Sequence, residues 1–184
     1  MTPKNKKLLF IFIGILILFI GVGIGLQLGK IIYTPDKNFS EIKKTSEPAD
    51  VSVAKVVRVI DGDTIEIEGG EKVRYIGIDA PETVEPGKSV QCFGREATAK
   101  NKELVEGKTV RLKKDLTDRD KYNRLLRYVF VGGNLINAEL VQLGFARAWA
   151  YPPDLKYQDQ INAAQQAAQK SRSGLWASCP ISQM

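Results

Sequence analysis

Alternating hydrophobic and polar positions predict three consecutive strands once the chain leaves its apolar amino-terminal region. Valine recurs through residues 51–60, which predicts a first strand. Isoleucine and glutamate alternate over residues 65–68, Gly69 and Gly70 supply a turn, and residues 73–78 are expected to return as the second strand of a hairpin. Because a hairpin brings its outer ends together, acidic residues on either side of it are expected to meet in space.

Helical and strand patterns alternate beyond this hairpin. Residues 94–106 have a helix-forming composition and end at Gly107, whereas residues 109–115 and 125–131 are typical of strands. The intervening loop, residues 116–124, is highly charged. Five strands without a regular βαβ repeat indicate an α+β fold, a five-stranded OB-fold β-barrel with three helices.

Two polar residues are placed to cap the second and third of these helices. Asn137 is expected to cap a short helix that ends at Gly144. Asp154 is expected to cap the last helix, which Gly174 closes. The buried face of that last helix is predicted from apolar residues at helical spacing, namely Tyr157, Ile161, Ala164 and Ala168.

An uncharged apolar run covers residues 8–29 and predicts one amino-terminal transmembrane helix, since about 20 residues cross a hydrocarbon core of about 30 Å. Lysines at positions 4, 6 and 7 place the basic tail, residues 1–7, in the cytoplasm. The run exceeds the usual apolar core of a signal peptide, and no A-x-A-like site follows it. An uncleaved signal anchor is therefore favoured, and a cleaved leader would instead give a secreted protein.

The remainder of the chain divides into a linker and a folded domain. Residues 30–50 are polar without sustained periodicity, which predicts a flexible linker. Residues 51–184 predict one domain outside the cell membrane, held by a single-pass anchor. The chain carries a net charge of +6, but residues 51–184 contain 20 lysines and arginines against 17 acidic residues, a net of +3. Basicity alone is therefore weak evidence for a nucleic-acid partner.

The composition restricts the chemistry of this domain. The chain has no histidine, which excludes histidine nucleophiles, general bases and zinc ligands. Two cysteines are too few for a zinc site made of cysteine alone. Cys92 and Cys179 form either one disulfide or two unpaired thiols, and the predicted external location favours the disulfide.

Carboxylates at both ends of the hairpin are candidate ligands of a hard cation. Asp63 precedes its first strand, and Asp79 and Glu82 follow its second. Such oxygen donors suit calcium, although the same residues also fit an ordinary Asp-Gly turn and loop. Arg74 lies inside the returning strand and needs an acidic or anionic partner. That partner is either a bound phosphate or one of the nearby carboxylates.

The charged loop offers a second cluster, in which Tyr122 is surrounded by Arg119, Lys121, Arg124 and Arg127. One interpretation is a solvated loop. The other is a second arginine that reaches the same phosphate, because two guanidiniums can hold phosphoryl oxygens bidentately. Tyr122, Trp149 and Tyr151 either stack on nucleobases or pack against the barrel, which makes Tyr151 a candidate substrate-binding residue.

Six segments between about residue 53 and residue 176 together resemble the staphylococcal nuclease (thermonuclease) family. They occur in the family's order, as VIDGDTIEI, VRYIGIDAPE, FGREA, DKYNRLLRYVF, LINAELVQLGFARA and SGLW. The resemblance implies an OB-fold enzyme that uses calcium to hydrolyse DNA and RNA phosphodiesters with 3′-phosphate products. By position it assigns calcium binding to Asp63, Asp79 and the Ala80 carbonyl, catalysis to Arg74, Glu82 and Arg124, and substrate contacts to Lys121 and Tyr122.

The chain departs from the family pattern at Ala80, which stands in the place of a threonine whose backbone carbonyl binds the ion, and at two places near the assigned residues. Asn123 stands where glycine is common before the second arginine, and asparagine tolerates the left-handed backbone that such a turn requires. The segment around Trp149 and Tyr151 is one residue shorter than in the family. Alanine supplies the same backbone carbonyl as threonine, so the calcium ligand expected at Ala80 is kept.

Two functions from different classes follow. The first is a membrane-tethered calcium-dependent nuclease, with DNA and RNA as substrates and with no obligate protein partner. The alternative is a catalytically inactive OB-fold nucleic-acid-binding module on the same tether. The joint presence of Asp63, Arg74, Asp79, Glu82 and Arg124 favours the enzyme, because degenerate modules are expected to lose such residues. The paired arginines also argue against a purely structural calcium site.

Overall fold

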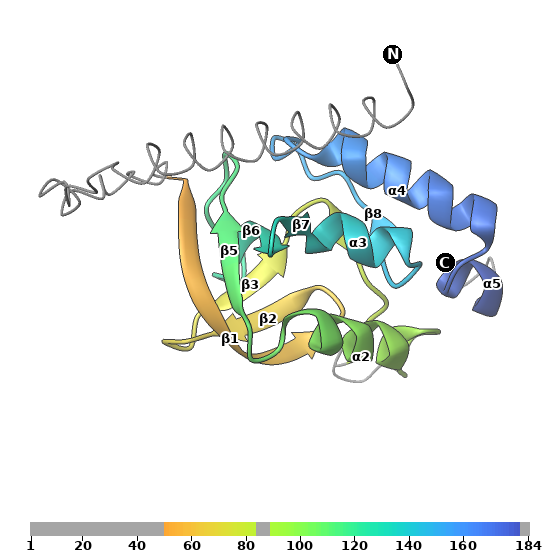
Figure 1. Ribbon diagram of the computed structural model, residues 1–184, viewed down its shortest axis with the longest axis horizontal. Helices are drawn as coiled ribbons and strands as arrows, with labels where there is room; N and C mark the ends of the chain where they lie inside the picture. The colour runs from red at the N-terminus through yellow and green to blue at the C-terminus, as the bar shows by residue number, and fades with distance from the viewer. Residues whose placement is uncertain (1–49, 84–88, 181–184) are drawn as a thin grey trace, which may run out of the picture. The chain divides into compact units, whose positions relative to one another are not determined.

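A computed structural model describes residues 50–83 and 89–180, and it places a closed five-stranded barrel at the centre of this domain (Figure 1). The barrel strands are β1 (Val51–Asp61), β2 (Thr64–Ile67), β3 (Lys72–Tyr75), β5 (Thr109–Lys113) and β6 (Leu125–Val131). They follow the order β3-β2-β1-β5-β6, and a parallel pairing of β3 with β6 closes the sheet. The other neighbouring pairs are antiparallel. The predicted five-stranded barrel is confirmed.

The returning strand of the hairpin is shorter than predicted. It ends at Tyr75, and Gly77 then turns the chain with a φ of +81° that favours glycine. The next residues form β4 (Ile78–Asp79), which pairs with β8 (Arg147–Ala148) in a separate two-stranded ladder. The prediction of one continuous strand over residues 73–78 was therefore wrong. The alternation of hydrophobic and polar residues could not reveal this second ladder, because β8 lies about 70 residues after β4.

Another short strand that was not predicted, β7 (Asn134–Leu135), extends the sheet beside β6.

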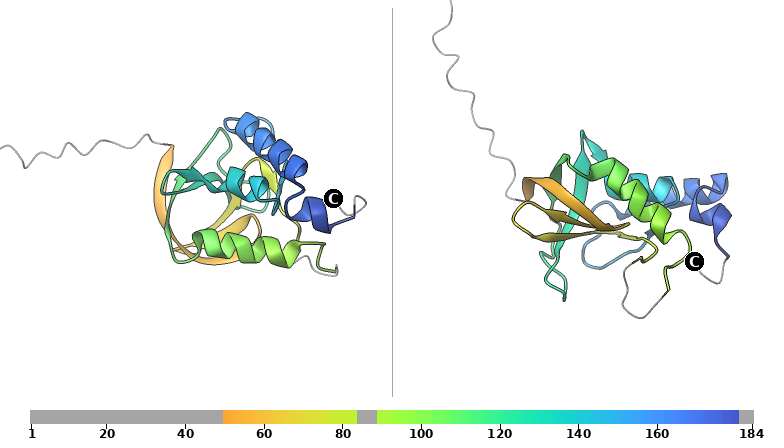
Figure 2. Two further views of the ribbon diagram at one scale, coloured as in Figure 1. Left: turned by 45° about the vertical axis from the view of Figure 1, so that its right-hand side comes forward. Right: turned by 90° about the horizontal axis from the view of Figure 1, so that it is seen from below.

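Within the described residues, four helices lie along one side of the barrel (Figures 1 and 2). They are α2 (Gly94–Val105), α3 (Ile136–Gln142), α4 (Gln158–Ser171) and α5 (Leu175–Ser178). In both figures α3 runs between α2 and α4. The three predicted helices are confirmed, and α5 was not expected. Gly174 precedes α5 rather than closing α4, which instead ends at Arg172 in a left-handed conformation.

The two predicted helix caps were wrong, because both side chains bind elsewhere. Asn137 is fully buried, accepts a hydrogen bond from Val129 N (2.9 Å) and donates one to Ile76 O (2.8 Å). Asp154 is also fully buried, and its Oδ1 accepts hydrogen bonds from two backbone N–H groups of the charged loop, those of Leu116 and Thr117. Buried polar side chains of this kind satisfy backbone groups of distant segments, so they join parts of the fold that a helix cap would leave separate.

The hydrophobic core fills the barrel and continues under α3 and α4. Its largest fully buried side chains include Tyr75, Tyr128, Ile65, Leu112, Leu140 and Ile161. The predicted buried face of α4 is confirmed for Ile161, Ala164 and Ala168, while Tyr157 packs against the core at its edge. Burial of each large aliphatic side chain stabilises the fold by about 1.5–3 kcal/mol, which holds the barrel as a rigid frame.

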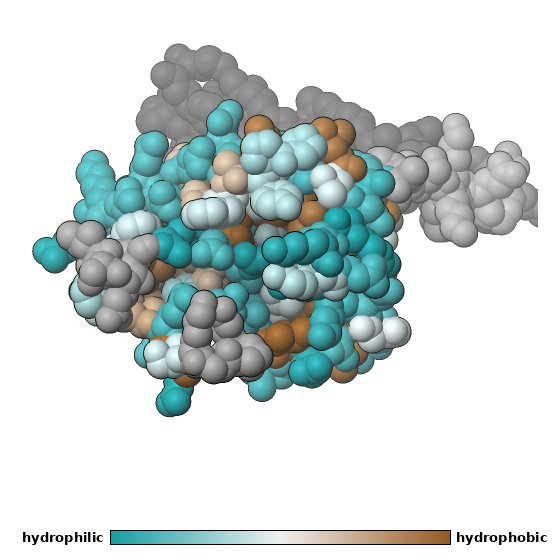
Figure 3. Space-filling view, turned by 180° about the vertical axis from the view of Figure 1, so that it is seen from behind, coloured by the Kyte–Doolittle hydropathy of each residue, from teal (hydrophilic) through white to brown (hydrophobic). Residues whose placement is uncertain are grey.

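The predicted anchor (residues 8–29) and almost all of the predicted linker lie outside the described residues. Across residues 50–83 and 89–180, no helix combines the length and hydropathy needed to cross a membrane. The face drawn in Figure 3 is predominantly hydrophilic, with only small, separated hydrophobic patches on the described residues. The structure also joins Cys92 to Cys179 in a disulfide, so the pairing that the sequence left open is present.

Candidate active site

Arg74 on β3 is the centre of the candidate site. Its side chain is only 16% exposed, and its guanidinium forms ion pairs with Asp63 and with Asp79, the latter over 3.1 Å from Nη2 to Oδ1. Asp79 is bound a second time, by Arg147 Nη2 at 2.9 Å. The carboxylates at the two ends of the hairpin therefore meet, as the sequence predicted, and one guanidinium joins them.

Asp63 is fixed by the turn that precedes β2. Its Oδ2 accepts a hydrogen bond from Ala80 N at 2.8 Å, and its Oδ1 accepts one from the Thr64 hydroxyl at 3.1 Å. Its own N–H donates to Asp61 Oδ1 at 3.1 Å, which shapes the turn. Gly62 allows this turn to lie against Ala80, because a Cβ at Gly62 would come within 2.5 Å of the Ala80 Cβ. Close packing therefore holds the Asp63 carboxylate beside Ala80.

Arg124 reaches the hairpin through the strand pairing that closes the barrel. In the parallel ladder of β3 and β6, Val73 lies opposite Leu125, so the residue before Leu125 emerges next to β3. Arg124 Nη1 lies 3.5 Å from Thr64 Oγ1 on β2. The two arginines that the sequence placed 50 residues apart therefore stand on the same side of the barrel, which sequence reasoning alone left open.

Asp120 holds Arg124 in this position and was missed by the sequence analysis. Its Oδ2 binds Arg124 Nε at 2.7 Å, while its Oδ1 accepts the backbone N–H groups of Tyr122 and Arg124 at 2.9 Å each. Burial raises the pKa of Asp120, but the hydrogen bonds and charge of Arg124 outweigh it and hold this pKa below its usual value. Asn123 adopts the left-handed conformation that was expected, with a φ of +65°.

The charged loop divides into structural ion pairs and pocket residues. Arg119 binds Glu71 and Arg127 binds Asp118, each at 2.8 Å, so these two arginines serve the loop rather than the pocket. For these two arginines, the interpretation of the charge cluster as a solvated loop is the correct one. Lys121, Tyr122 and Arg124, in contrast, line the pocket described next.

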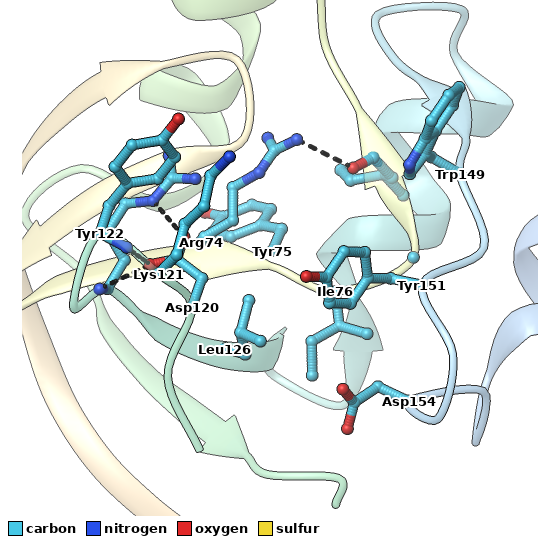
Figure 4. Close-up of a pocket in the computed structure, with 13 residues that line it drawn as sticks. Arg74, Tyr75, Ile76, Asp120, Lys121, Tyr122, Leu126, Trp149, Tyr151 and Asp154 are labelled. Atoms are coloured by element: carbon cyan, nitrogen blue, oxygen red, sulfur yellow. Dashed lines mark hydrogen bonds and ion pairs between the residues drawn. The ribbon is translucent and has the colours of Figure 1, made fainter. Parts of the chain in front are cut away.

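A pocket of about 250 Å³ opens beside Arg74 (Figure 4). In that view Arg74 lies between Lys121 and Tyr122 on one side and Trp149 and Tyr151 on the other. The three aromatic side chains are 67%, 58% and 52% exposed, in the order Tyr122, Trp149 and Tyr151. Their rings are therefore open to solvent at the rim, where a planar ligand could stack on them.

The electrostatics of the pocket reflect burial of its charged groups. Burial lowers the pKa of Arg74 from its usual value, while the charges of Asp79 and Asp61 oppose that change. Burial raises the pKa of Asp61, against the attraction of Arg74 and Arg124. An arginine has an ordinary pKa above about 12, so Arg74 keeps its positive charge and presents it to the pocket.

Glu82 lies in the loop after β4. Its backbone N–H donates to Gln91 Oε1 at 3.1 Å, and its carbonyl accepts the Gln91 N–H at 3.0 Å. In the part of the chain that the structure describes, it is not among the residues that line the 250 Å³ pocket. Of the nine residues assigned to calcium, catalysis or substrate, the pocket itself brings together Arg74, Lys121, Tyr122, Arg124 and Tyr151.

The donors around Asp63 fit a hard cation by their chemistry. Asp63 and Asp79 offer carboxylate oxygens, Ala80 offers a backbone carbonyl, and one guanidinium already binds both carboxylates. Calcium takes oxygen ligands in flexible geometry and accepts water or phosphate oxygens in its remaining positions. Among residues 50–83 and 89–180, no three histidine, cysteine, aspartate or glutamate side chains gather as a complete metal site.

Arg147 and Thr64 also belong to the site, although sequence reasoning did not select them. Arg147 faces Asp79 across the ladder of β4 and β8, and the Thr64 hydroxyl lies between Asp63 and Arg124. The signal for Arg147 was the one used for Arg74, an arginine inside an apolar segment that needs an acidic partner. Thr64 carries no such signal, since a threonine in a strand is ordinary.

Comparison with known proteins agrees with this architecture. A family model described as staphylococcal nuclease homologue matches residues 72–178. A thermonuclease of Staphylococcus hyicus is 44% identical over 126 residues, which cover 67% of this chain and 75% of that protein. A thermonuclease of Staphylococcus intermedius is 43% identical over 137 residues (73% and 82%), and the endonuclease YncB of Bacillus subtilis (strain 168) is 44% identical over 125 residues (65% and 59%). The chain therefore belongs to the staphylococcal nuclease family.

Proposed function

We propose that this protein is a calcium-dependent nuclease that hydrolyses phosphodiester bonds of DNA and RNA outside the cell membrane. The observation that carries the proposal is the convergence of Arg74 and Arg124 on one pocket, with the carboxylates of Asp63 and Asp79 against Arg74. A phosphodiester fits this arrangement, because its anionic oxygens can bind both guanidiniums beside a site for a hard metal ion. The relatives named as thermonucleases and as an endonuclease support the same reaction.

The two arginines hold and stabilise the scissile phosphate. Each is oriented before substrate arrives, Arg74 by Asp63 and Asp79 and Arg124 by Asp120. Attack on phosphorus spreads negative charge over the equatorial oxygens, and fixed guanidinium donors stabilise that charge without reorganising. The partly buried setting of Arg74 strengthens its interaction with the phosphate relative to bulk water.

Asp63, Asp79 and the Ala80 carbonyl would hold calcium. Bound calcium would supply positive charge beside the phosphate and favour loss of a proton from the attacking water. Glu82 accepts that proton or positions the water, because a carboxylate can serve as general base in a chain without histidine. Lys121, Tyr122 and Tyr151 bind the rest of the substrate, by charge and by stacking.

Cleavage in this proposal leaves the phosphate on the 3′ side, with the 5′-oxygen as leaving group. Arg124 lines the same pocket as Arg74 and would assist that oxygen. The resemblance to the family, rather than the geometry, supplies this polarity. End-group analysis of a cleaved oligonucleotide tests it, since 5′-phosphate products would contradict it.

The predicted anchor over residues 8–29 places the enzyme on the outer side of the membrane. The disulfide between Cys92 and Cys179 supports that location, because such bonds persist in oxidising compartments. Protease added to intact cells is expected to remove the domain. Full protection from protease would overturn the proposed orientation.

The decisive experiment incubates the purified full chain with DNA and with RNA, in calcium and then in excess chelator. Cleavage is expected in calcium and lost in chelator, and Glu82→Gln and Arg124→Ala are each expected to lose at least about a hundredfold in kcat. Binding of nucleic acid without calcium-dependent cleavage would identify an inactive binding module instead. Undiminished cleavage by both variants would exclude the assigned roles.

A further inference from the structure

The loop that carries Glu82 is tied at its far end by residues that the family assignment does not use. Gln91 forms two hydrogen bonds with Glu82, one to the Glu82 carbonyl from its backbone N–H (3.0 Å) and one from the Glu82 N–H to its side-chain Oε1 (3.1 Å). Gln91 therefore closes the loop on the backbone of the proposed general base.

Cys92, the next residue, fixes this closure to the other end of the domain. Its disulfide to Cys179 spans a sequence separation of 87 residues and attaches the loop to the end of α5. Phe93 adds a stacked contact with Phe145, with 5.3 Å between ring centroids. Both contacts hold Cys92 and Phe93 to the part of the domain that follows Arg124. No residue in that part is assigned to calcium or catalysis.

The attachment point on α5 is itself rigid. Leu175 is buried, and its N–H donates to the Gly144 carbonyl at 2.9 Å. The backbones of Gly144 and Gly174 approach so closely that a Cβ on either residue would come within 2.2 Å of a carbonyl oxygen of the opposing segment. The disulfide therefore joins the loop to a segment that cannot easily shift.

On its other side, the backbone of Pro81 and Glu82 lies against Gly94 in the first turn of α2. Gly94 donates its N–H to the Gln91 carbonyl at 3.0 Å. A Cβ on Gly94 would lie 2.8 Å from the Glu82 carbonyl oxygen and 3.2 Å from that of Pro81, so only glycine allows this approach. Glu82 is thus held between α2 and Gln91, and the disulfide is the covalent part of that support.

We propose that Gln91 is a positioning residue for Glu82 and that the Cys92–Cys179 disulfide makes cleavage conditional on oxidation of this pair. The inference rests on the proposed nuclease function. Loss of the bond frees the residue next to Gln91 from α5, which lets the Glu82 backbone drift from its place. Asp63, Arg74 and Arg124 lie on or next to barrel strands and Asp79 lies in the ladder of β4 and β8, so strand pairing rather than this bond holds their ion pairs.

The switch is a thiol–disulfide exchange. A dithiol reductant transfers two electrons and two protons, the S–S bond breaks, Cys92 and Cys179 become thiols, and the reductant becomes a disulfide. The reverse step requires a disulfide oxidant, of the thioredoxin-like class that acts outside the cytoplasm. Both cysteines are partly exposed and accessible to such reagents. A chain made in a reducing compartment would therefore remain a weak nuclease until export.

The first test compares oxidised and reduced forms of the full chain, purified in mild detergent, on one oligonucleotide in saturating calcium. Reduction by dithiothreitol is expected to lower kcat about tenfold or more, since a displacement near 1 Å can cost on the order of a hundredfold. The KM and the calcium Kd are expected to change less than about twofold. Reoxidation is expected to restore kcat. An unchanged kcat after complete reduction, verified by thiol titration, would overturn the inference.

The second test separates positioning from general loss of stability. Cys92→Ser/Cys179→Ser is expected to reproduce the reduced enzyme and to be insensitive to dithiothreitol. Val110→Ala, on β5 in the barrel core at 0% exposure, is expected to lower Tm and to keep kcat. The two variants are assayed at temperatures equally far below their own Tm values. If Val110→Ala then loses as much kcat as the double cysteine variant, the effect comes from lost stability alone and the inference fails.

The third test addresses Gln91 itself. Gln91→Met keeps the length of the side chain but removes the oxygen that accepts the Glu82 N–H, and a fall of about threefold to tenfold in kcat with unchanged KM is expected. In a Glu82→Gln background the same substitution is expected to have no further effect, because it acts only through Glu82. Additive losses in that background would contradict the positioning role. If the oxidised wild-type chain shows no cleavage at all, the proposed function fails rather than this inference.

Discussion

Arg147 on β8 lies directly opposite Asp79 on β4, and its Nη2 is 2.9 Å from Asp79 Oδ2. Arg74 binds the other oxygen of the same carboxylate at 3.1 Å. Asp79 is therefore held by two guanidiniums from different ladders. One of them, Arg74, has a role toward phosphate in the proposed mechanism, whereas Arg147 has no partner in that mechanism other than Asp79. This relationship gives Arg147 a distinct and testable effect on calcium.

Replacement of Arg147 by glutamine is expected to tighten calcium binding. The guanidinium competes with a cation for Asp79 Oδ2, and both side chains are about 30% exposed, so the screened interaction is small. A change of about 0.5–1 kcal/mol, or about twofold to fivefold in Kd, is expected at low salt. Calorimetric titration of calcium measures it, and the effect is expected to shrink at high salt. Arg111→Gln, on β5, is the matched control, and weaker calcium binding by Arg147→Gln would show that Arg147 orients the ligand instead.

Substitution of Asp120 by asparagine is expected to lower kcat about tenfold by releasing the Arg124 guanidinium. The Asn side chain keeps an oxygen for the N–H groups of Tyr122 and Arg124, so the turn is expected to survive. Because Asp120 acts through Arg124, the same substitution in an Arg124→Gln background is expected to have little effect. Kinetics of the four proteins form a double-mutant cycle, and strictly additive losses would exclude the positioning role.

The Asp120–Arg124 pair is also expected to contribute stability that depends on pH. Although burial raises the pKa of Asp120, the bonds with Arg124 hold it below the unfolded value of about 3.9. A depressed folded pKa gives stability that is present above about pH 4 and lost as pH falls through the folded pKa. Urea unfolding of wild type and Asp120→Asn is therefore expected to differ at pH 7, and the difference is expected to shrink as pH falls through the depressed pKa of Asp120. A constant difference across this range would contradict the assignment.

Replacement of the buried Asn137 by alanine is expected to destabilise the domain by about 2–4 kcal/mol. The substitution leaves Val129 N–H and Ile76 C=O without their side-chain partners, and each buried unsatisfied group costs about 1–3 kcal/mol. Urea unfolding measures the loss. Asn134→Ala, at an exposed position of β7, is the control and is expected to change stability by less than about 0.5 kcal/mol. Equal losses in the two variants would show that the two hydrogen bonds of Asn137 do not stabilise the fold.

Substitution of Gly62 by alanine is expected to damage the proposed calcium site as well as the fold. A Cβ there would lie 2.5 Å from the Ala80 Cβ, which forces the Asp63 turn away from Ala80 at a cost of about 1–3 kcal/mol. Gly69→Ala is the control, because a side chain at its φ of +91° costs a similar amount of folding free energy. The new Cβ would have no atom within 4 Å, so it would displace no neighbouring residue. Calcium Kd is therefore expected to rise in Gly62→Ala and to stay unchanged in Gly69→Ala. A parallel change in both would attribute the effect to stability alone.

The sequence predicted those parts of the fold that depend on local pattern. The helix at Gly94–Val105 ends before Gly107, whose φ of +74° is the conformation that the glycine signalled. The strand at Leu125–Val131 was predicted with its bounds. The caps assigned to Asn137 and Asp154 failed because each side chain found a distant backbone partner. A local capping signal cannot compete with a buried partner that only the folded chain supplies.

For the site, the sequence by itself determined the chemical types: carboxylates and arginines without histidine, around a hairpin that had to bring Asp63 and Asp79 together. Tertiary structure decided which of several arginines face the pocket. Arg119 and Arg127 are taken up by Glu71 and Asp118, while Arg124 stands beside β3 because β6 closes the barrel there. That closure is a pairing between strands about 50 residues apart, and its register follows from packing of the whole core rather than from any local pattern.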